Sequence, residues 1–273
     1  MGSAMDNREA DPPPMSLTDE TRRLIRSIVG FPELAMRVAW LGEQFDGKSD
    51  ESIARVLDLL TAYSQLPDES ARESTLALSV LLARRRDSAW LWALHQTAKQ
   101  HALINLERTL RPTTSGPPSS RDQPELPVPD YGGGRPLSVG ERKSIARRPT
   151  RLQLERLLHD PHPLVIAQLL SAPGLTEDDV ITMVTRRPAY VPTLELIIAS
   201  SRWIVRRRVR LSLILNPGSP HHLVLPFLIT LPREDLQLIV ETTTTSVALR
   251  AVAHELHQRL PPLKYEIQLE GLH

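Results

Sequence analysis

Five arginines fall within nine residues of the sequence, at positions 202–210. Arg202, Arg206 and Arg210 are four residues apart, so on one continuous helix their side chains form a single stripe. Guanidinium groups arranged in this way bind phosphates or the carboxylates of an acidic protein. Trp203 lies beside them, and tryptophan and arginine are enriched at interface hot spots. We therefore predict that a partner binds at Arg202, Trp203, Arg206, Arg207 and Arg210.

The same residues also fit a simpler interpretation, a solvated helix face whose arginine stems cover apolar surface. The distribution of charge favours binding. Residues 137–210 contain 13 basic and 7 acidic side chains, a net charge of +6, although the whole chain carries only +1. Residues 16–111 balance at 13 of each sign, and residues 211–273 carry 4 basic and 6 acidic side chains. The basic excess is therefore local, and it would attract a polyanion.

Trp92 is a second candidate contact residue. Trp90 and Trp92 are two positions apart, so on one helix their side chains point about 200° apart. If Trp90 packs inward with Leu94, Trp92 lies at the surface, where an exposed tryptophan is typical of an interface. The alternative is that the interior of a helical bundle takes both rings.

Residue types that carry out catalysis or hold metals do not fall into a recognisable pattern. His254 and His257 are three positions apart, which is not the spacing of the zinc metalloprotease motif. The sequence has no cysteine, which excludes a cysteine nucleophile and a thiolate metal site. The glycines at 132–134 have no strand before them, so they do not form a dinucleotide-binding loop. We therefore predict no metal, no cofactor and no enzymatic activity.

Periodic apolar residues predict helices throughout residues 16–111 and 137–262, and no alternating strand pattern occurs. Residues 112–136 include seven prolines and four glycines, a composition that cannot bury enough apolar surface to order itself. We predict an N-terminal helical domain, a linker at 112–136 and a C-terminal helical domain. Residues 1–15 are predicted to be a disordered tail whose first four residues look like a recombinant leader, and residues 263–273 form a second tail.

The C-terminal half contains an internal repeat. The sequence Ala-Arg-Arg-Pro at 146–149 recurs as Thr-Arg-Arg-Pro at 185–188 and, more weakly, as Thr-Leu-Pro-Arg at 230–233. The prolines of these segments are 39 and 44 residues apart. A Pro-Gly turn at 173–174 likewise matches one at 217–218. A period of about 40–47 residues built from short helices is typical of HEAT and armadillo repeats.

Residues 141–260 resemble a bacterial α-solenoid of the HEAT-like or leucine-rich-repeat-variant kind. The resemblance rests on the stretch Leu157–Val165, with its Asp-Pro-His-Pro turn, and on the two Pro-Gly turns. It implies short helices stacked into repeats, and it implies no particular activity. The expected fold class is therefore all-α, with an N-terminal helical domain and a short HEAT- or armadillo-like α-solenoid.

Stacked helical repeats present extended surfaces that suit protein binding. We therefore expect a non-enzymatic, cytoplasmic bacterial adaptor or scaffold that binds a protein partner through the solenoid surface. The alternative is a HEAT-like protein that binds nucleic acid through the arginines of residues 202–210. No stretch of about 18 apolar residues predicts a membrane span. The N-terminus also lacks the apolar core of a secretory signal.

Overall fold

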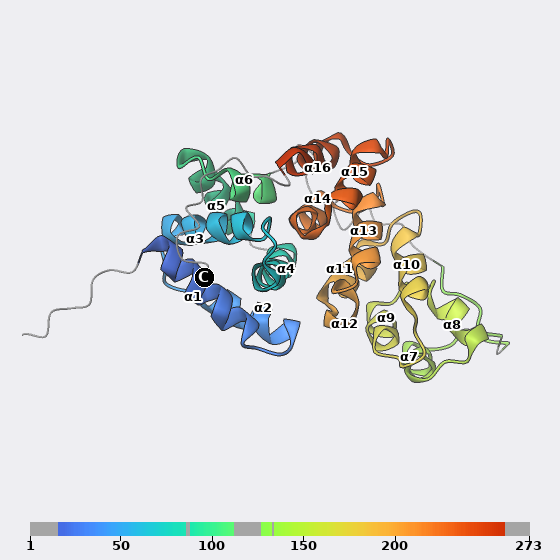
Figure 1. The fold of residues 1–273 in the computed structure, drawn as a ribbon. Helices are drawn as coiled ribbons and strands as arrows, with labels where there is room; N and C mark the ends of the chain where they lie inside the picture. Colours follow the sequence, from blue (N-terminus) through green and yellow to red (C-terminus); the bar gives the residue numbers. More distant parts are fainter. Residues whose placement is uncertain (1–15, 86–87, 112–126, 133, 260–273) are drawn as a thin grey trace, which may run out of the picture.

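The computed structural model describes residues 16–85, 88–111, 127–132 and 134–259, and within these ranges every regular element is a helix (Figure 1). This confirms the predicted all-α class. The predicted tails at 1–15 and 263–273, and residues 112–126 of the predicted linker, lie outside the described residues. Among the helices that are described, none combines the length and the apolar character needed to cross a membrane.

The N-terminal helices form where the sequence predicts helices. They are α1 (Leu17–Val29), α2 (Leu34–Glu43), α3 (Asp50–Tyr63), α4 (Glu69–Arg84), α5 (Ser88–Gln100) and α6 (Ile104–Leu110). The side chains of Ser16, Ser49 and Asp68 accept amide hydrogen bonds and so cap α1, α3 and α4. A short break separates α5 from α6 within this region. Ala102 has a φ of 52°, which a right-handed helix does not allow, and it lies between α5 and α6.

The C-terminal half consists of shorter helices. They are α7 (Val139–Arg147), α8 (Arg151–Leu157), α9 (Pro163–Leu170), α10 (Glu177–Thr185), α11 (Val191–Ala199), α12 (Ser201–Ile204), α13 (Arg207–Leu215), α14 (His221–Val224), the 3₁₀ helix η2 (Leu225–Thr230), α15 (Arg233–Glu241) and α16 (Val247–Arg259). Capping boxes begin α7, α8 and α10, with Ser138, Thr150 and Thr176 at the N-cap. These caps fix where each short helix starts.

The C-terminal helices lie in two rows. In the first row α7 contacts α9 and α9 contacts α11, whereas in the second row α10 contacts α13 and α13 contacts α15 (Figure 1). Helices α8, α10, α13 and α15 begin at residues 151, 177, 207 and 233, so the second row repeats every 26–30 residues. This interval is shorter than the 39 and 44 residues of the sequence match. The two Arg-Arg-Pro sequences follow α7 and α10, which belong to different rows.

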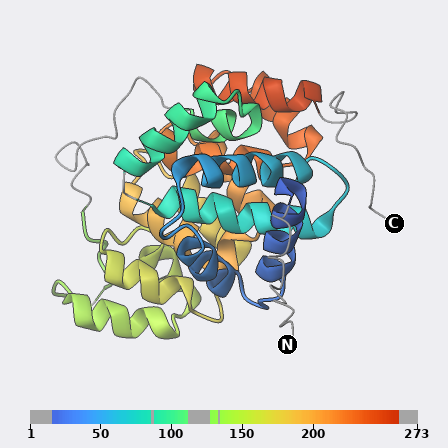
Figure 2. The same ribbon diagram turned by 90° about the vertical axis from the view of Figure 1, so that its left-hand side faces the viewer.

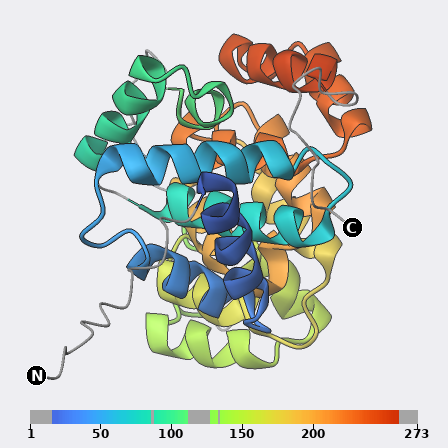
Figure 3. The same cartoon turned by 60° about the vertical axis from the view of Figure 1, so that its left-hand side comes forward.

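Helix α4 lies at the centre of the molecule, between the other N-terminal helices and the first row (Figures 2 and 3). It contacts α1, α2 and α3 on one side and α11, α14 and η2 on the other. Ser74 and Ala77 of α4 are fully buried. The Ser79 hydroxyl donates a hydrogen bond to the Pro226 carbonyl oxygen at 2.6 Å. The division into two domains stays a prediction, but one connected set of buried side chains includes helices from both halves.

The described end of the predicted linker is attached to the C-terminal helices. The Tyr131 hydroxyl donates a hydrogen bond to a carboxylate oxygen of Asp160 at 2.7 Å. Asp160 is buried and also pairs with the buried Arg142. Burial, followed by the hydrogen bond to Asp160, raises the pKa of Tyr131. This contact fixes the chain just before it enters α7.

Replacing Phe227 by alanine tests whether the two halves unfold together. Phe227 is fully buried in η2, which packs on α4. We expect a loss of about 3–5 kcal/mol, because truncating a buried aromatic ring leaves a cavity. Urea unfolding followed by tryptophan fluorescence in a Trp203→Phe background reports on the N-terminal tryptophans alone. Their midpoint should fall as well, because the core is connected. Val247→Ala, at a side chain that is 74% exposed, is the control. An unchanged N-terminal midpoint would contradict coupled unfolding.

Candidate functional site

The predicted arginine stripe does not exist, because residues 202–210 are not one helix. Helix α12 ends at Ile204 and α13 begins at Arg207. Residues 205–206 lie between the two helices, and the backbone of Arg206 is extended. Helical spacing places side chains on one face only along a continuous helix, so this prediction was wrong. The segment makes three different kinds of contact instead.

Trp203 is a core residue, which corrects its prediction as an exposed contact. Its side chain is 3% exposed, and the indole N–H donates to the Leu170 carbonyl oxygen at 2.8 Å. The Arg202 guanidinium lies over the indole ring, 4.4 Å from its centroid. The same guanidinium donates to the carbonyl oxygens of Ala172 and Leu175 at 2.8 and 3.3 Å. Arg202 and Trp203 therefore attach α12 to the chain that follows α9.

Arg210 is also buried, at 9% exposed. Its Nη1 donates hydrogen bonds of 2.8 Å to the carbonyl oxygens of both Ile204 and Val205. Burial lowers the pKa of Arg210 to about 10. These carbonyls stand at the break between α12 and α13, so Arg210 stabilises the break and is not available to a partner.

Three ion pairs join the starts of neighbouring second-row helices, and we call them the ion-pair ladder: Arg151–Asp179, Asp178–Arg208 and Arg207–Asp235. Their N–O distances are 2.9, 2.9 and 2.7 Å. Arg207 donates through both Nε and Nη2, so its contact with Asp235 is bidentate. The ladder links α8 to α10, α10 to α13 and α13 to α15.

The ladder also offsets an unfavourable position of two arginines. Arg151 and Arg207 are the first residues of α8 and α13, where the helix dipole repels a cation. Each is paired with an aspartate in the first turn of the next helix, where the dipole favours an anion. Burial raises the pKa of Asp179, but hydrogen bonds from Thr176 and Arg151 outweigh burial, so its pKa lies below its ordinary value. The hydrogen bond to Asp235 raises the pKa of Arg207.

Exposed side chains remain next to ladder residues at two places, and we call them together the outer edge: Arg147, Arg148 and Leu152 at the end of α7 and the start of α8, and Val205 and Arg206 at the break between α12 and α13. Leu152 is 60% exposed and Val205 is 43% exposed. All three arginines are exposed. None of them forms an ion pair with a residue that the structure describes. Of the predicted contact arginines, Arg202 and Arg206 are exposed and form no ion pair with a described residue, but the Arg202 guanidinium already contacts two carbonyl groups and the Trp203 ring.

The structure places Trp92 at the surface, with 56% of its area exposed. Trp90 is half-buried and its ring stacks on Phe45, with centroids 6.1 Å apart. The two tryptophans therefore point in different directions, as their spacing predicts. Trp92 lies on α5, in the N-terminal half, whereas the outer edge belongs to the C-terminal helices.

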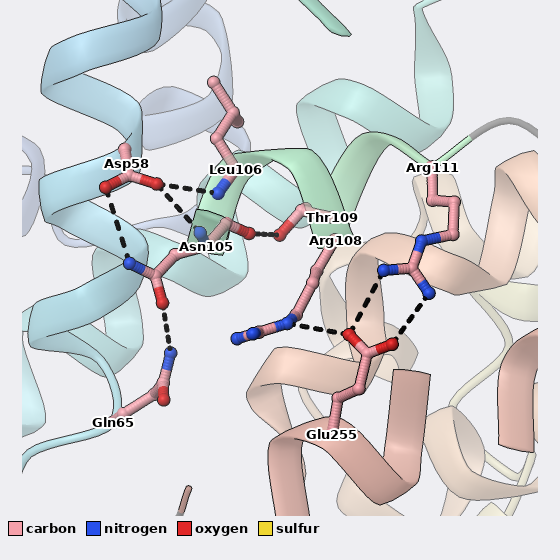
Figure 4. Close-up of polar contacts among 8 residues, drawn as sticks. All are labelled: Asp58, Gln65, Asn105, Leu106, Arg108, Thr109, Arg111 and Glu255. Atoms are coloured by element: carbon pink, nitrogen blue, oxygen red, sulfur yellow. Dashed lines mark hydrogen bonds and ion pairs between the residues drawn. The ribbon is translucent and has the colours of Figure 1, made fainter. Parts of the chain in front are cut away.

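A polar cluster that the sequence did not predict holds α6 against α3 (Figure 4). One carboxylate oxygen of Asp58 accepts hydrogen bonds from the backbone N–H groups of Asn105 and Leu106, at 2.9 and 3.0 Å. Asp58 therefore satisfies the first amide groups of α6 from a different helix, in place of a local cap.

The same short helix is joined to α16 by charge (Figure 4). Glu255 of α16 accepts a hydrogen bond of 2.8 Å from Arg108 and two, of 2.9 and 3.1 Å, from Arg111. Burial raises the pKa of Glu255. The hydrogen bonds and charges of Arg111 and Arg108 lower it by more than burial raises it, so the pKa lies below its ordinary value of 4.5. The partners are 144 and 147 positions apart in sequence, and no local spacing indicates this contact.

No group of three or more His, Asp or Glu side chains in the described ranges is arranged to hold a metal ion. The sequence gives no candidate nucleophile, and the structure brings none of the predicted residues into a catalytic arrangement. No family model matches the chain, and no curated protein or solved structure matches it. The geometry of the outer edge and the ion-pair ladder therefore carries the functional argument.

Arg207 and Arg206 are adjacent but differ in their contacts, so they make a matched pair. Arg207→Gln removes a bidentate partner from the buried Asp235 and should lower the free energy of unfolding by about 1–2 kcal/mol. Arg206→Gln removes an exposed side chain with no ion pair and should change it by less than about 0.5 kcal/mol. Urea unfolding measures both. Equal losses of unfolding free energy in the two variants would contradict a stabilising role of the ion-pair ladder.

Glu255→Gln should destabilise the protein in a pH-dependent way. The pKa of Glu255 in the folded protein lies below its ordinary value of 4.5, so its ionised form favours folding. The difference in unfolding free energy between the parent protein and Glu255→Gln should be about 1 kcal/mol at pH 7. It should shrink as the pH falls below 4.5 and through the folded pKa. Glu43→Gln, at an exposed side chain, is the control. A difference that is constant from pH 7 to 3 would contradict the assignment.

Proposed function

We propose that the protein is a non-enzymatic scaffold that binds a protein partner through the outer edge of its C-terminal helices. The observation that carries this proposal is the exposure of Leu152 and Val205 beside the ion-pair ladder. Apolar side chains among arginines suit the centre and rim of a protein interface. The two rows of short helices support the interpretation of residues 141–260 as an α-solenoid, whose surfaces suit protein binding.

The face of the first row is less suited to a partner. Helix α4 packs on α11, α14 and η2, and the Ser79 hydroxyl bonds to the chain within η2. A partner at this face would have to displace helices of the same chain. The proposal therefore assigns binding to the outer edge and not to the face that α4 covers. It also assigns the protein to the bacterial cytoplasm, in keeping with the composition.

Nucleic-acid binding is the second candidate. The observation that favours it is the presence of three exposed arginines without an ion pair to a described residue: Arg147, Arg148 and Arg206. Against it, Arg207 and Arg208 already pair with carboxylates, and Arg210 is buried. Three phosphate contacts would make the affinity fall roughly 40-fold between about 50 and 200 mM salt.

The test captures partners from host lysate with the full chain, with and without nuclease. The parent protein is compared with a Val205→Glu, Arg206→Glu double variant, and Val247→Glu is the matched control. We expect a partner that survives nuclease and is retained by the control. The double variant should lose at least about tenfold in affinity, as expected for residues near the centre of an interface. Retention by the double variant would overturn the assignment to the outer edge. Loss on nuclease treatment would favour the nucleic-acid candidate.

A further inference from the structure

A groove with a volume of about 240 Å³ lies between α1, α2 and the start of α3, far along the chain from the outer edge. Its lining includes the apolar side chains of Trp40, Phe45 and Ile53. Its rim includes the charged side chains of Arg23 and Lys48, with Glu20 beside them. A concave apolar surface with a few convergent polar groups is the usual form of a small-ligand site.

The aromatic lining of the groove is held by contacts outside it. The Trp40 ring packs on Phe31 with centroids 5.8 Å apart, and the Phe45 ring stacks on Trp90 at 6.1 Å. Gly47 has a φ of 75°, which a glycine adopts without strain, and the turn there precedes Lys48 at the rim. These contacts fix the positions of the aromatic side chains that line the groove.

The charge at the rim favours one negative charge in the groove. The Lys48 ammonium pairs with the Glu20 carboxylate at 3.2 Å, so these two charges balance. Arg23 is exposed, and no described residue accepts a hydrogen bond from its guanidinium. The rim therefore has one unbalanced cation, and Glu20 would repel a second anionic group.

We propose that this groove binds a small monoanion with an apolar body, such as a carboxylate joined by a short chain to a phenyl ring. The apolar body lies against Trp40 and Phe45, and the carboxylate accepts hydrogen bonds from Arg23. Charge complementarity selects the carboxylate, because a guanidinium presents paired donors that match its two oxygens. A volume of about 240 Å³ suits a small ligand.

Three probes of the same shape test the proposal with the full chain: 4-phenylbutanoate, 4-phenylbutan-1-ol and 4-phenylbutylammonium. The readout is the Trp40 indole N–H signal in ¹H–¹⁵N spectra, assigned with Trp40→Phe. We expect saturable shifts with the anion and a dissociation constant on the order of 1 mM. The alcohol should bind about fivefold more weakly. The ammonium compound should bind more weakly still.

Two variants and a control locate the site. Arg23→Gln should weaken the anion about fivefold, to the affinity of the alcohol. Arg26→Gln, on the same helix but outside the groove lining, should leave it unchanged. Ser27→Phe should fill the groove and abolish binding by all three probes, with an unchanged circular dichroism spectrum.

The proposal is overturned if the three probes bind equally, or if Arg26→Gln weakens the anion as much as Arg23→Gln. It is also overturned if no probe shifts the Trp40 signal at 10-fold above the expected dissociation constant. Binding that occurs only in a variant beginning at Ser16 would show that the first 15 residues of the chain occupy the groove instead. Shifts that depend on protein concentration without a probe would identify a second copy as the occupant.

Discussion

Helix α4 has to fit between two groups of helices, and this constraint shapes the rest of the protein. Four consecutive residues in its middle, 77–80, are buried, and four successive side chains point to all sides of a helix. Such an enclosed helix needs small side chains and internally satisfied polar groups. The Ser79 hydroxyl meets this need, because it lies 2.9 Å from the Thr75 carbonyl and 2.6 Å from that of Pro226. Helices of both halves pack on this one element, and their buried side chains form one connected set.

This packing changes which surfaces remain for function. Helix α4 packs on α11 and so covers part of the first row. The second row is held together by the ion-pair ladder, which uses charges that would otherwise be available to a polyanion. The exposed apolar side chains and arginines of the outer edge remain, and the proposed binding of a protein partner rests on them. The groove of α1–α3 is separate from that edge and calls for a different kind of ligand.

The sequence predicts the features that depend on local periodicity, and it misses those that depend on distant contacts. The helical regions, and the different directions of Trp90 and Trp92, follow from spacing along one helix. The contacts of the arginines do not follow from local spacing, because Arg207 pairs with a carboxylate 28 positions away and Arg111 pairs with Glu255, 144 positions away. Tryptophan is a residue type that is enriched at interfaces, yet the Trp203 side chain is buried and its indole N–H donates to the Leu170 carbonyl oxygen. The Arg-Arg-Pro sequences follow helices of different rows, so their spacing of 39 residues differs from the 26–30 residues between successive second-row helix starts.

The buried guanidinium of Arg210 stabilises the corner between α12 and α13. A helix that ends and restarts within two residues leaves its last carbonyl groups without amide donors. Here one side chain donates to both carbonyls, of Ile204 and Val205, from within the following helix. These two hydrogen bonds therefore fix the direction in which the chain turns between α12 and α13. Val205 is thereby presented to solvent at a constant angle, so a partner that recognises it meets a rigid surface.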